Sequence, residues 1–444
     1  MLKRGSRGTS WVFQDGICNL RYLSVKFFPV SVLGGGGVVF SWAIYRFHPG
    51  ADVCGTTKGR IFTIPPLPYH RNPHPCTEHL SHIPAYPITP STVAMATSNK
   101  ALIYKKTPTA LPVPGEHILV EDRPIDITTP PPAGGLVVEI LYSSVDPYMR
   151  GRMRDPSIPS YAPPFTLDEP VPGGGVAKVL LSGDEEAFPV GTHVVGMFPI
   201  AEYARVDDAK AASVRKIVNP HNLQDLSLFI GALGMPGLTA WSALHRIGKP
   251  KAGETIFISS AAGAVGQIVG QIAKREGLTV IGSVGSDEKL DFITRELGFD
   301  AGFNYKKESP FDALPRLAPQ GIDIYFENVG GDHLEAALAN MNLQGRIPVC
   351  GMIADYNTPR EQQKGIKGLM AIIAKQITVQ GFLVGNPDFG PAYFLEHQQK
   401  LGQWLAEGSV KAKQSVTEGI DNAAEAFVGM LQGKNFGKAV IKTR

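Results

Sequence analysis

The stretch of this 444-residue chain best suited to chemistry is a turn of small residues at 261–266, with the sequence AAGAVG. The run before it, 255–260, is rich in β-branched and aromatic residues and predicts a buried strand. The turn leads into a helical pattern that Gly277 ends, and residues 278–284 predict a second strand. A strand, turn, helix and strand in this order hold the pyrophosphate of a dinucleotide at the helix N-terminus. The stretch therefore predicts a dinucleotide-binding site.

The glycines of this turn have separate tasks. Gly263 lets the backbone approach a pyrophosphate closely, and Gly266 lets the helix pack tightly against the strand. Ala261 stands where the usual fingerprint has its first glycine, so the motif departs from the standard form. The alternative is a tight turn without a ligand. The two strands and the amphipathic helix around the turn favour nucleotide binding.

The end of the second predicted strand indicates which nucleotide binds. An NAD enzyme usually has an acidic residue about 20 residues after the first glycine, which binds the ribose hydroxyls. Residues 282–286 (GSVGS) are small and neutral instead, and Lys289 follows them. Asp287 and Glu288 suit the first turn of the next helix, with Ser286 as its N-cap. The pattern favours the 2′-phosphate of NADP, with a solvated helix position as the alternative for Lys289.

Cysteine, histidine and charge exclude other classes of protein. Three of the four cysteines lie in the first 76 residues, which leaves Cys350 in the rest of the chain. A catalytic zinc needs cysteine, histidine and acidic ligands, and no cysteine accompanies His193 and His221, so we predict no metal site. The net charge of +3, with charges interspersed, gives no reason to expect nucleic-acid binding. The cysteine pattern is typical of a reduced, cytoplasmic enzyme.

The first 94 residues differ from the rest. Residues 27–45 contain no charged side chain and follow several basic residues, which is compatible with a signal anchor or a membrane span. Pro29 and the glycines at 34–37 weaken any helix there, and the proline- and histidine-rich segment 65–90 has the composition of a disordered linker. We predict that residues 1–94 are disordered and dispensable or an artefact of the gene model, and that the body, 95–444, does not enter a membrane.

The body divides by pattern into two domains. Short apolar runs separated by glycine and proline up to about residue 218 predict a β-rich, partly barrel-like domain. From about residue 226 helices and strands alternate, which predicts a doubly wound α/β domain of about six parallel strands. We expect the last strand, 439–442, to return to the β-rich domain. The predicted division is 95–228 plus 413–444 for the β-rich domain and 229–412 for the nucleotide-binding domain.

Residues 97–444 resemble the medium-chain dehydrogenase/reductase superfamily, and more narrowly its zinc-free leukotriene B4 dehydrogenase/prostaglandin reductase branch, which includes plant and fungal alkenal double-bond reductases. The motifs that carry the resemblance are DPYMR (146–150), GMPGLT (234–239), AGAVG (262–266), GSDEK (285–289), FNYK (303–306), ENVGG (327–331) and NFGK (435–438). The resemblance implies a GroES-like β-rich domain, a Rossmann domain that binds NADPH, a small enal or enone as the substrate, and a homodimer. Residues 1–94 have no counterpart in it.

The resemblance also implies the residues that contact the cofactor. The pyrophosphate would lie along Ala262, Gly263, Ala264, Val265 and Gly266. Lys289 and Tyr305 would bind the 2′-phosphate end. Asn328 would lie at the cofactor turn, and Asn435 would reach the site from the C-terminal tail. The nicotinamide would be bordered by Cys350, Gly351, Met352, Phe382, Leu383 and Val384.

The chemistry implied is the transfer of a hydride to the β-carbon of an α,β-unsaturated aldehyde or ketone. Negative charge then builds on the carbonyl oxygen, which needs a hydrogen-bond donor. Tyr356 is the first candidate for this donor, and Tyr148 is the second, more in the role of a pocket wall; packing alone is the alternative for either. Asp355 departs from the small neighbours usual in this family. Residues 161–174 form a proline-rich loop that would shape substrate entry.

Three other functions share these motifs. A quinone reductase, or an enoyl reductase of a biosynthetic pathway, would have the same fold and cofactor. A protein that binds NADPH without catalysis would keep the nucleotide site alone. Oxidation of an allylic alcohol with NADP is also possible within the same branch.

Overall fold

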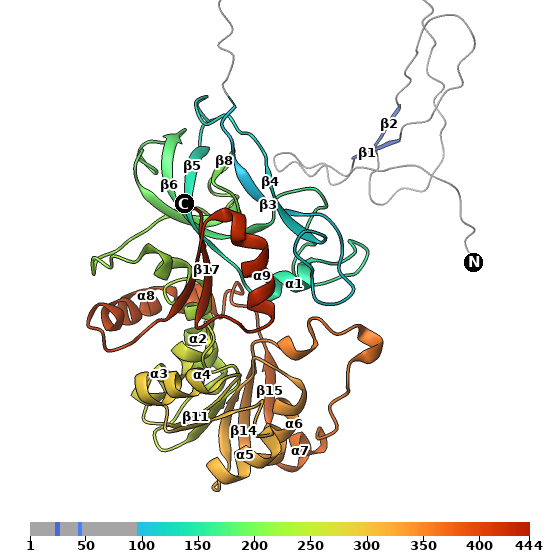
Figure 1. Cartoon of the computed structure of the whole chain (residues 1–444), viewed down its shortest axis with the longest axis vertical. Helices are drawn as coiled ribbons and strands as arrows, with labels where there is room; N and C mark the ends of the chain where they lie inside the picture. The colour runs from blue at the N-terminus through green and yellow to red at the C-terminus, as the bar shows by residue number, and fades with distance from the viewer. Residues whose placement is uncertain (1–22, 27–42, 47–95) are drawn as a thin grey trace, which may run out of the picture. The chain divides into compact units, whose positions relative to one another are not determined.

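The computed structural model describes residues 23–26, 43–46 and 96–444 (Figure 1). The chain divides into two units, Met1–Ile88 and Thr89–Arg444. In the first, strands β1 (Leu23–Lys26) and β2 (Ala43–Arg46) pair antiparallel. The prediction for 1–94 otherwise lies outside the described residues. No helix among the residues described has the length and apolar character needed to span a bilayer.

A six-stranded parallel sheet forms the centre of the nucleotide-binding half. Its order is β12 (Ala301–Asn304), β11 (Thr279–Val284), β10 (Thr255–Ile258), β13 (Ile322–Phe326), β14 (Met341–Val349) and β15 (Thr378–Gly381). The chain starts in the middle, runs to one edge, returns and runs to the other, as in a doubly wound fold. The α/β class predicted from the alternating pattern is confirmed. Strand β14 begins at Met341, which pairs in parallel with Ile322 of β13.

Helices cover both faces of this sheet, which explains why its inner strands β10 and β13 are apolar and mostly buried. On one face α2 (Met235–Ala243) and α3 (Gly266–Arg275) pack with alternate β10 residues such as Ile256. On the other, α5 (Pro310–Leu317) and α6 (Gly331–Asn340) pack around Phe257. Two shorter helices, α4 (Asp287–Asp291) and α7 (Met370–Ala374), follow β11 and precede β15.

The β-rich half contains a seven-stranded sheet and a hairpin. The sheet runs β16 (Gln414–Glu418), β17 (Lys438–Lys442), β5 (Leu136–Ser144), β6 (Pro172–Ser182), β7 (His193–Pro199) and β9 (Arg215–Lys216), and β8 (Tyr203–Val206) also pairs with β5. The hairpin is β3 (Lys100–Tyr104) and β4 (Ile118–Asp122). Helices α1 (Tyr148–Arg152), α8 (Gly390–Ala406) and α9 (Ala423–Leu431) complete the body. The last strand, β17, pairs antiparallel with β5, so the end of the chain completes the β-rich sheet (Figure 1).

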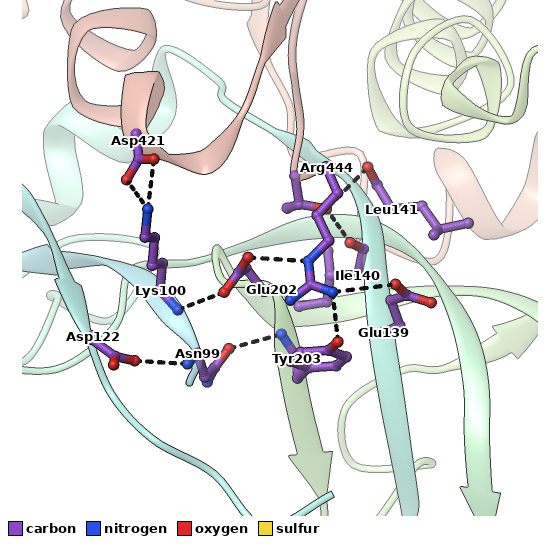
Figure 2. A network of polar contacts seen from close by, with 11 residues as sticks. Asn99, Lys100, Asp122, Glu139, Ile140, Leu141, Glu202, Tyr203, Asp421 and Arg444 are labelled. Carbon is purple, nitrogen blue, oxygen red and sulfur yellow. Dashed lines mark hydrogen bonds and ion pairs between the residues drawn. The ribbon is translucent and has the colours of Figure 1, made fainter. Parts of the chain in front are cut away.

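The last residue is tied into this sheet by a polar network (Figure 2). Arg444 Nε donates to Glu202 Oε1 at 3.1 Å, and its Nη1 donates to the Tyr203 hydroxyl at 2.7 Å. The other Glu202 oxygen accepts from the backbone of Lys100, whose Nζ forms an ion pair with Asp421. The network joins β3, β8 and the segment after β16 to the C-terminus, and so holds the tail in place.

Candidate functional site

The predicted pyrophosphate turn lies between β10 and α3. A Cβ atom on Gly266 would lie 2.8 Å from the Cα of Ala261 and closer still to the Ser260 carbonyl, so only glycine fits where the helix meets the strand. The Asn328 side chain, from the turn after β13, donates to the Ser259 carbonyl at 2.8 Å, and its backbone N–H donates to the Ser259 hydroxyl at 2.9 Å. The small residues at 262–266 thus form a narrow concave turn at the N-terminus of α3, which is suited to a phosphate group.

The predicted 2′-phosphate end brings together Lys289, Lys306 and Tyr305. Burial, and then the neighbouring charge of Lys306, lower the pKa of Lys289. The Tyr305 hydroxyl lies beside Gly285, at 3.1 Å from where a Cβ would stand. Asp287 does not face this group as a ribose ligand, because it pairs with Lys307. The positive charges of Lys289 and Lys306 repel each other, and an anion between them would offset this repulsion. This end of the site therefore suits a phosphate group.

The predicted nicotinamide end follows β14. Cys350 and Gly351 both donate their backbone N–H to the Glu327 carbonyl, at 2.9 and 3.1 Å. The Tyr356 hydroxyl lies 3.0 Å from where a Cβ on Gly351 would stand, so the glycine leaves room for the phenol. Met352 packs against Gly330 in the turn after β13. Tyr356 is therefore fixed beside the carboxyl end of a central strand, where ligands bind in open α/β sheets.

The segment after β15 borders the same end. Phe382 packs against the core cluster that also contacts Cys350, and its ring stacks on Phe389 with centroids 5.1 Å apart. The Val384 carbonyl accepts a hydrogen bond from Gly390 at the start of α8, while Leu383 is exposed. Cys350 and Phe382, 32 positions apart in the sequence, thus pack against the same hydrophobic core cluster.

Both candidate tyrosines are protonated over the ordinary pH range. Burial raises the pKa of Tyr356 to about 12. Burial, and then the negative charge of Asp146, raise the pKa of Tyr148 to about 12. A protonated phenol donates a hydrogen bond and does not act as a base. The environment of each tyrosine thus suits a neutral donor to an oxygen that gains negative charge.

The C-terminal tail meets the nucleotide turn through its backbone. Gly437 donates its N–H to the Ala262 carbonyl at 2.8 Å. The Asn435 side chain donates to the Gly437 carbonyl at 2.7 Å, so it shapes the tail loop instead of pointing freely from it. Lys289 Nζ donates to the Gly433 carbonyl at 2.6 Å, which attaches the tail to the 2′-phosphate end as well. Sequence reasoning predicted neither tail contact.

An ion pair between Asp146 and Lys438 was also missed. Lys438 Nζ donates to Asp146 Oδ1 at 2.9 Å and to the Val145 carbonyl at 2.6 Å, and both side chains are buried. The pair joins the DPYMR and NFGK motifs and holds the start of α1, which carries Tyr148. The signal available in the sequence was an acid and a base in two separate motifs, without anything to pair them.

Glu327 belongs to the ENVGG motif, from which no role for its side chain was predicted. In the structure it organises the proposed cofactor turn. It is fully buried, and its Oε1 accepts from the backbone N–H groups of Val329 and Gly330 at 2.6 and 2.8 Å and from the Tyr325 hydroxyl at 2.8 Å. Burial raises its pKa. The carboxyl group therefore holds the backbone of the turn that leads from Asn328 into α6.

No group of three or more histidine, cysteine or acidic side chains suited to a metal ion occurs within the part of the chain that the structure describes. The polar side chains in that part of the chain instead take part in hydrogen-bonded turns and ion pairs.

Two family models match the body. One, described as the N-terminal domain of oxidoreductase, matches residues 100–214, and one described as zinc-binding dehydrogenase matches 264–396. The NADP-dependent oxidoreductase RED1 of Cochliobolus heterostrophus is 51% identical over 344 residues, which are 78% of this chain and 97% of that protein. The chain belongs to the medium-chain dehydrogenase/reductase family.

Other members of this family are also similar over nearly their full length. The NADP(+)-dependent 2-alkenal reductase of Nicotiana tabacum is 42% identical over 351 residues, 79% of this chain and 98% of that protein. The structure of CurA from Vibrio vulnificus in complex with NADPH is 35% identical, with a TM-score of 0.70, and covers 78% of this chain and 99% of that one. These relatives confirm the predictions of the family, of NADP as cofactor and of an oxidoreductase.

Proposed function

We propose that this protein uses NADPH to reduce the carbon–carbon double bond of α,β-unsaturated aldehydes and ketones without a metal. The observation that supports this most is the protonated Tyr356, which lies partly buried beside Gly351 after β14. A neutral phenol is suited to stabilise an enolate, and no metal is then needed to polarise the carbonyl. The similarity to the tobacco 2-alkenal reductase points the same way.

When bound, NADPH would supply a hydride to the β-carbon of the substrate, and a proton from water would complete the saturated product at the α-carbon. The Tyr356 hydroxyl donates a hydrogen bond to the carbonyl oxygen, on which negative charge develops. Tyr148 forms a wall of the pocket from α1. The turn at 262–266 holds the central pyrophosphate, and the group of Lys289, Lys306 and Tyr305 holds the 2′-phosphate end. Phe382 with Cys350 excludes water from the nicotinamide end.

The test is NADPH oxidation by the purified protein with 4-hydroxy-nonenal, an aromatic enone and a quinone in parallel, and with NADH as a control. We expect turnover with the enones and a saturated product by mass spectrometry. Turnover with the quinone alone would assign the chain to quinone reduction. Tight NADPH binding without turnover would favour a binding role, and NADP reduction by an allylic alcohol would reveal alcohol oxidation.

Lys289 should decide the preference for NADPH over NADH. Replacing it with alanine removes a charge-assisted hydrogen bond to the 2′-phosphate, so Kd for NADPH should rise about 10- to 100-fold, and Kd for NADH should change little. Quenching of tryptophan fluorescence measures both constants. Lys307→Ala is the matched control, because that lysine is exposed and paired with Asp287. Equal loss of affinity for both nucleotides would contradict a phosphate contact.

Cys350 should resist the electrophiles that the enzyme consumes. Burial, and then the charge of Glu327, raise its pKa to about 12, so the thiolate is scarce at all pH values below that. We expect iodoacetamide at pH 8 to label Cys350 at least about tenfold more slowly than a free cysteine of ordinary pKa. Peptide-resolved mass spectrometry separates it from the other cysteines, and labelling as fast as in the urea-unfolded chain would contradict this.

The proposed assembly is a homodimer built on β15. This strand is the outer edge of the parallel sheet, and all four of its residues are exposed. Beside it in the sequence, Met370 and Ile373 of α7 are 71% and 72% exposed. An exposed edge strand with adjacent apolar side chains is suited to pair with a second copy. Light scattering should give a mass twice that of the 47.7-kDa chain. The Val379→Lys variant should instead give the mass of a single chain.

In this proposal the two halves of the body divide the work. Residues 95–228 with 413–444 form the substrate domain, and residues 229–412 bind the nucleotide. The cysteine distribution supports action in the cytoplasm. Limited proteolysis with and without NADPH tests the division into domains, because the first cuts should fall near residues 228 and 412. Cell fractionation tests the location.

A further inference from the structure

Arg150 is a buried arginine that the reaction described above does not use. Arg150 lies in α1 and is only 8% exposed. Its Nη2 donates to the carbonyls of Ala110 and Pro108, at 2.7 and 3.3 Å. Its Nε donates to the side-chain oxygen of Asn357 at 3.0 Å. All three acceptors are neutral, so the guanidinium forms no ion pair with them. Its role here is to form several hydrogen bonds in fixed directions.

These hydrogen bonds join three segments that are remote in sequence. The carbonyls of Pro108 and Ala110 belong to the loop between β3 and β4, and Arg150 itself belongs to α1. Asn357 is 207 positions further along and directly follows Tyr356. The contact therefore fastens the loop after β14 to the β-rich half, next to the proposed hydrogen-bond donor.

On the N-terminal side of Tyr356, the loop after β14 is anchored to the turn after β13. Ile353 and Ala354 donate their backbone N–H groups to the carbonyls of Asn328 and Val329, at 3.3 and 3.0 Å. That anchor fixes the first half of the loop to the nucleotide-binding half. Tyr356 itself donates its backbone N–H only within the loop, to Ile353. The backbone of Met352 hydrogen-bonds to the Tyr356 hydroxyl, and Asn357 links the residue after Tyr356 to α1.

We propose that Arg150 is a positioning residue that, through Asn357, holds the Tyr356 hydroxyl over Gly351. The inference rests on the proposed function for its kinetic consequence. Without the hydrogen bond the residues directly after Tyr356 lose their fastening to the β-rich half, and the phenol no longer stays aimed at the developing negative charge. A displacement of about 1 Å can reduce turnover by as much as about 100-fold.

The test removes the acceptor and leaves the buried arginine in place. Asn357→Ala should lower kcat for an enone about 10- to 100-fold without changing Kd for NADPH. Asn357→Asp keeps an acceptor and should retain kcat within a few-fold. Asn342→Ala is the matched control, since it removes a hydrogen bond to Asp323 from the far end of β14. It should leave kcat unchanged.

Two further measurements separate positioning from a general structural effect. In a Tyr356→Phe background, Asn357→Ala should cause no additional loss of kcat, because the two act as one unit. Hydrogen exchange at residues 353–358 should accelerate in Asn357→Ala and not in Asn342→Ala. Additive losses, or unchanged exchange, would overturn the inference. A Tyr356→Phe variant with full activity would overturn the proposed donor, while the exchange result would still decide whether Arg150 fastens the loop.

Discussion

Replacing Tyr356 with phenylalanine should lower kcat for enone reduction about 100- to 1,000-fold, which is the usual effect of removing one donor to a developing oxyanion. The hydroxyl lies beside Gly351 in a buried setting, where a hydrogen bond to a charged oxygen is stronger than in water. The ring remains and fills the same space, so the fold and Kd for NADPH should not change. Steady-state kinetics with one enone and fluorescence titration with NADPH measure the two effects.

The pH dependence gives a second check on this role. A donor must be protonated, and the pKa of Tyr356 is about 12, so the proton is present below that value and is lost only above it. The kcat of the wild type should therefore show no fall due to Tyr356 between pH 6 and about 10. Tyr148→Phe serves as the comparison and should have the smaller effect. A larger loss in Tyr148→Phe than in Tyr356→Phe would reverse the assignment.

Replacing Lys438 with methionine should destabilise the folded body by about 3–5 kcal/mol, because it leaves the Asp146 carboxylate buried without its partner. Both side chains are almost inaccessible, at 3% and 7% exposed, and the lysine also satisfies the Val145 carbonyl. Because the pair holds the start of α1, activity should fall together with stability. Urea unfolding followed by circular dichroism measures the change through the midpoint of the transition.

Two variants show whether burial is the cause. Lys442→Met removes a lysine from the same strand, but its pair with Glu418 is exposed, so the cost should be at most about 1 kcal/mol. Adding Asp146→Asn to Lys438→Met removes the unpaired charge and should recover part of the lost stability. Equal effects of Lys438→Met and Lys442→Met would show that the buried pair contributes no more than a surface one.

Much of the nucleotide site could be predicted because its signals are local. The small residues around Gly266 follow β10 directly, and the helix they start is adjacent in sequence. The neutral end of β11 and Lys289 lie within one βαβ unit, so their relation to the cofactor depends on only one crossover. The burial of Glu327 could not be predicted in this way, because a carboxyl group after a strand is as common on the surface as beneath a turn.

The sequence by itself determined the fold class, the family and the preference for NADP, since each depends on residue types at short spacing. Only the tertiary structure decided that Asp146 pairs with Lys438, 292 positions away, that Arg150 reaches Asn357, and that the tail contacts Ala262 and Lys289. Hydrogen bonds and ion pairs act over a few ångströms, and one charged or amide side chain carries no mark of its distant partner. The packing of the β-rich half against the parallel sheet selects these pairs, and so places Tyr356 and α1 at the same site.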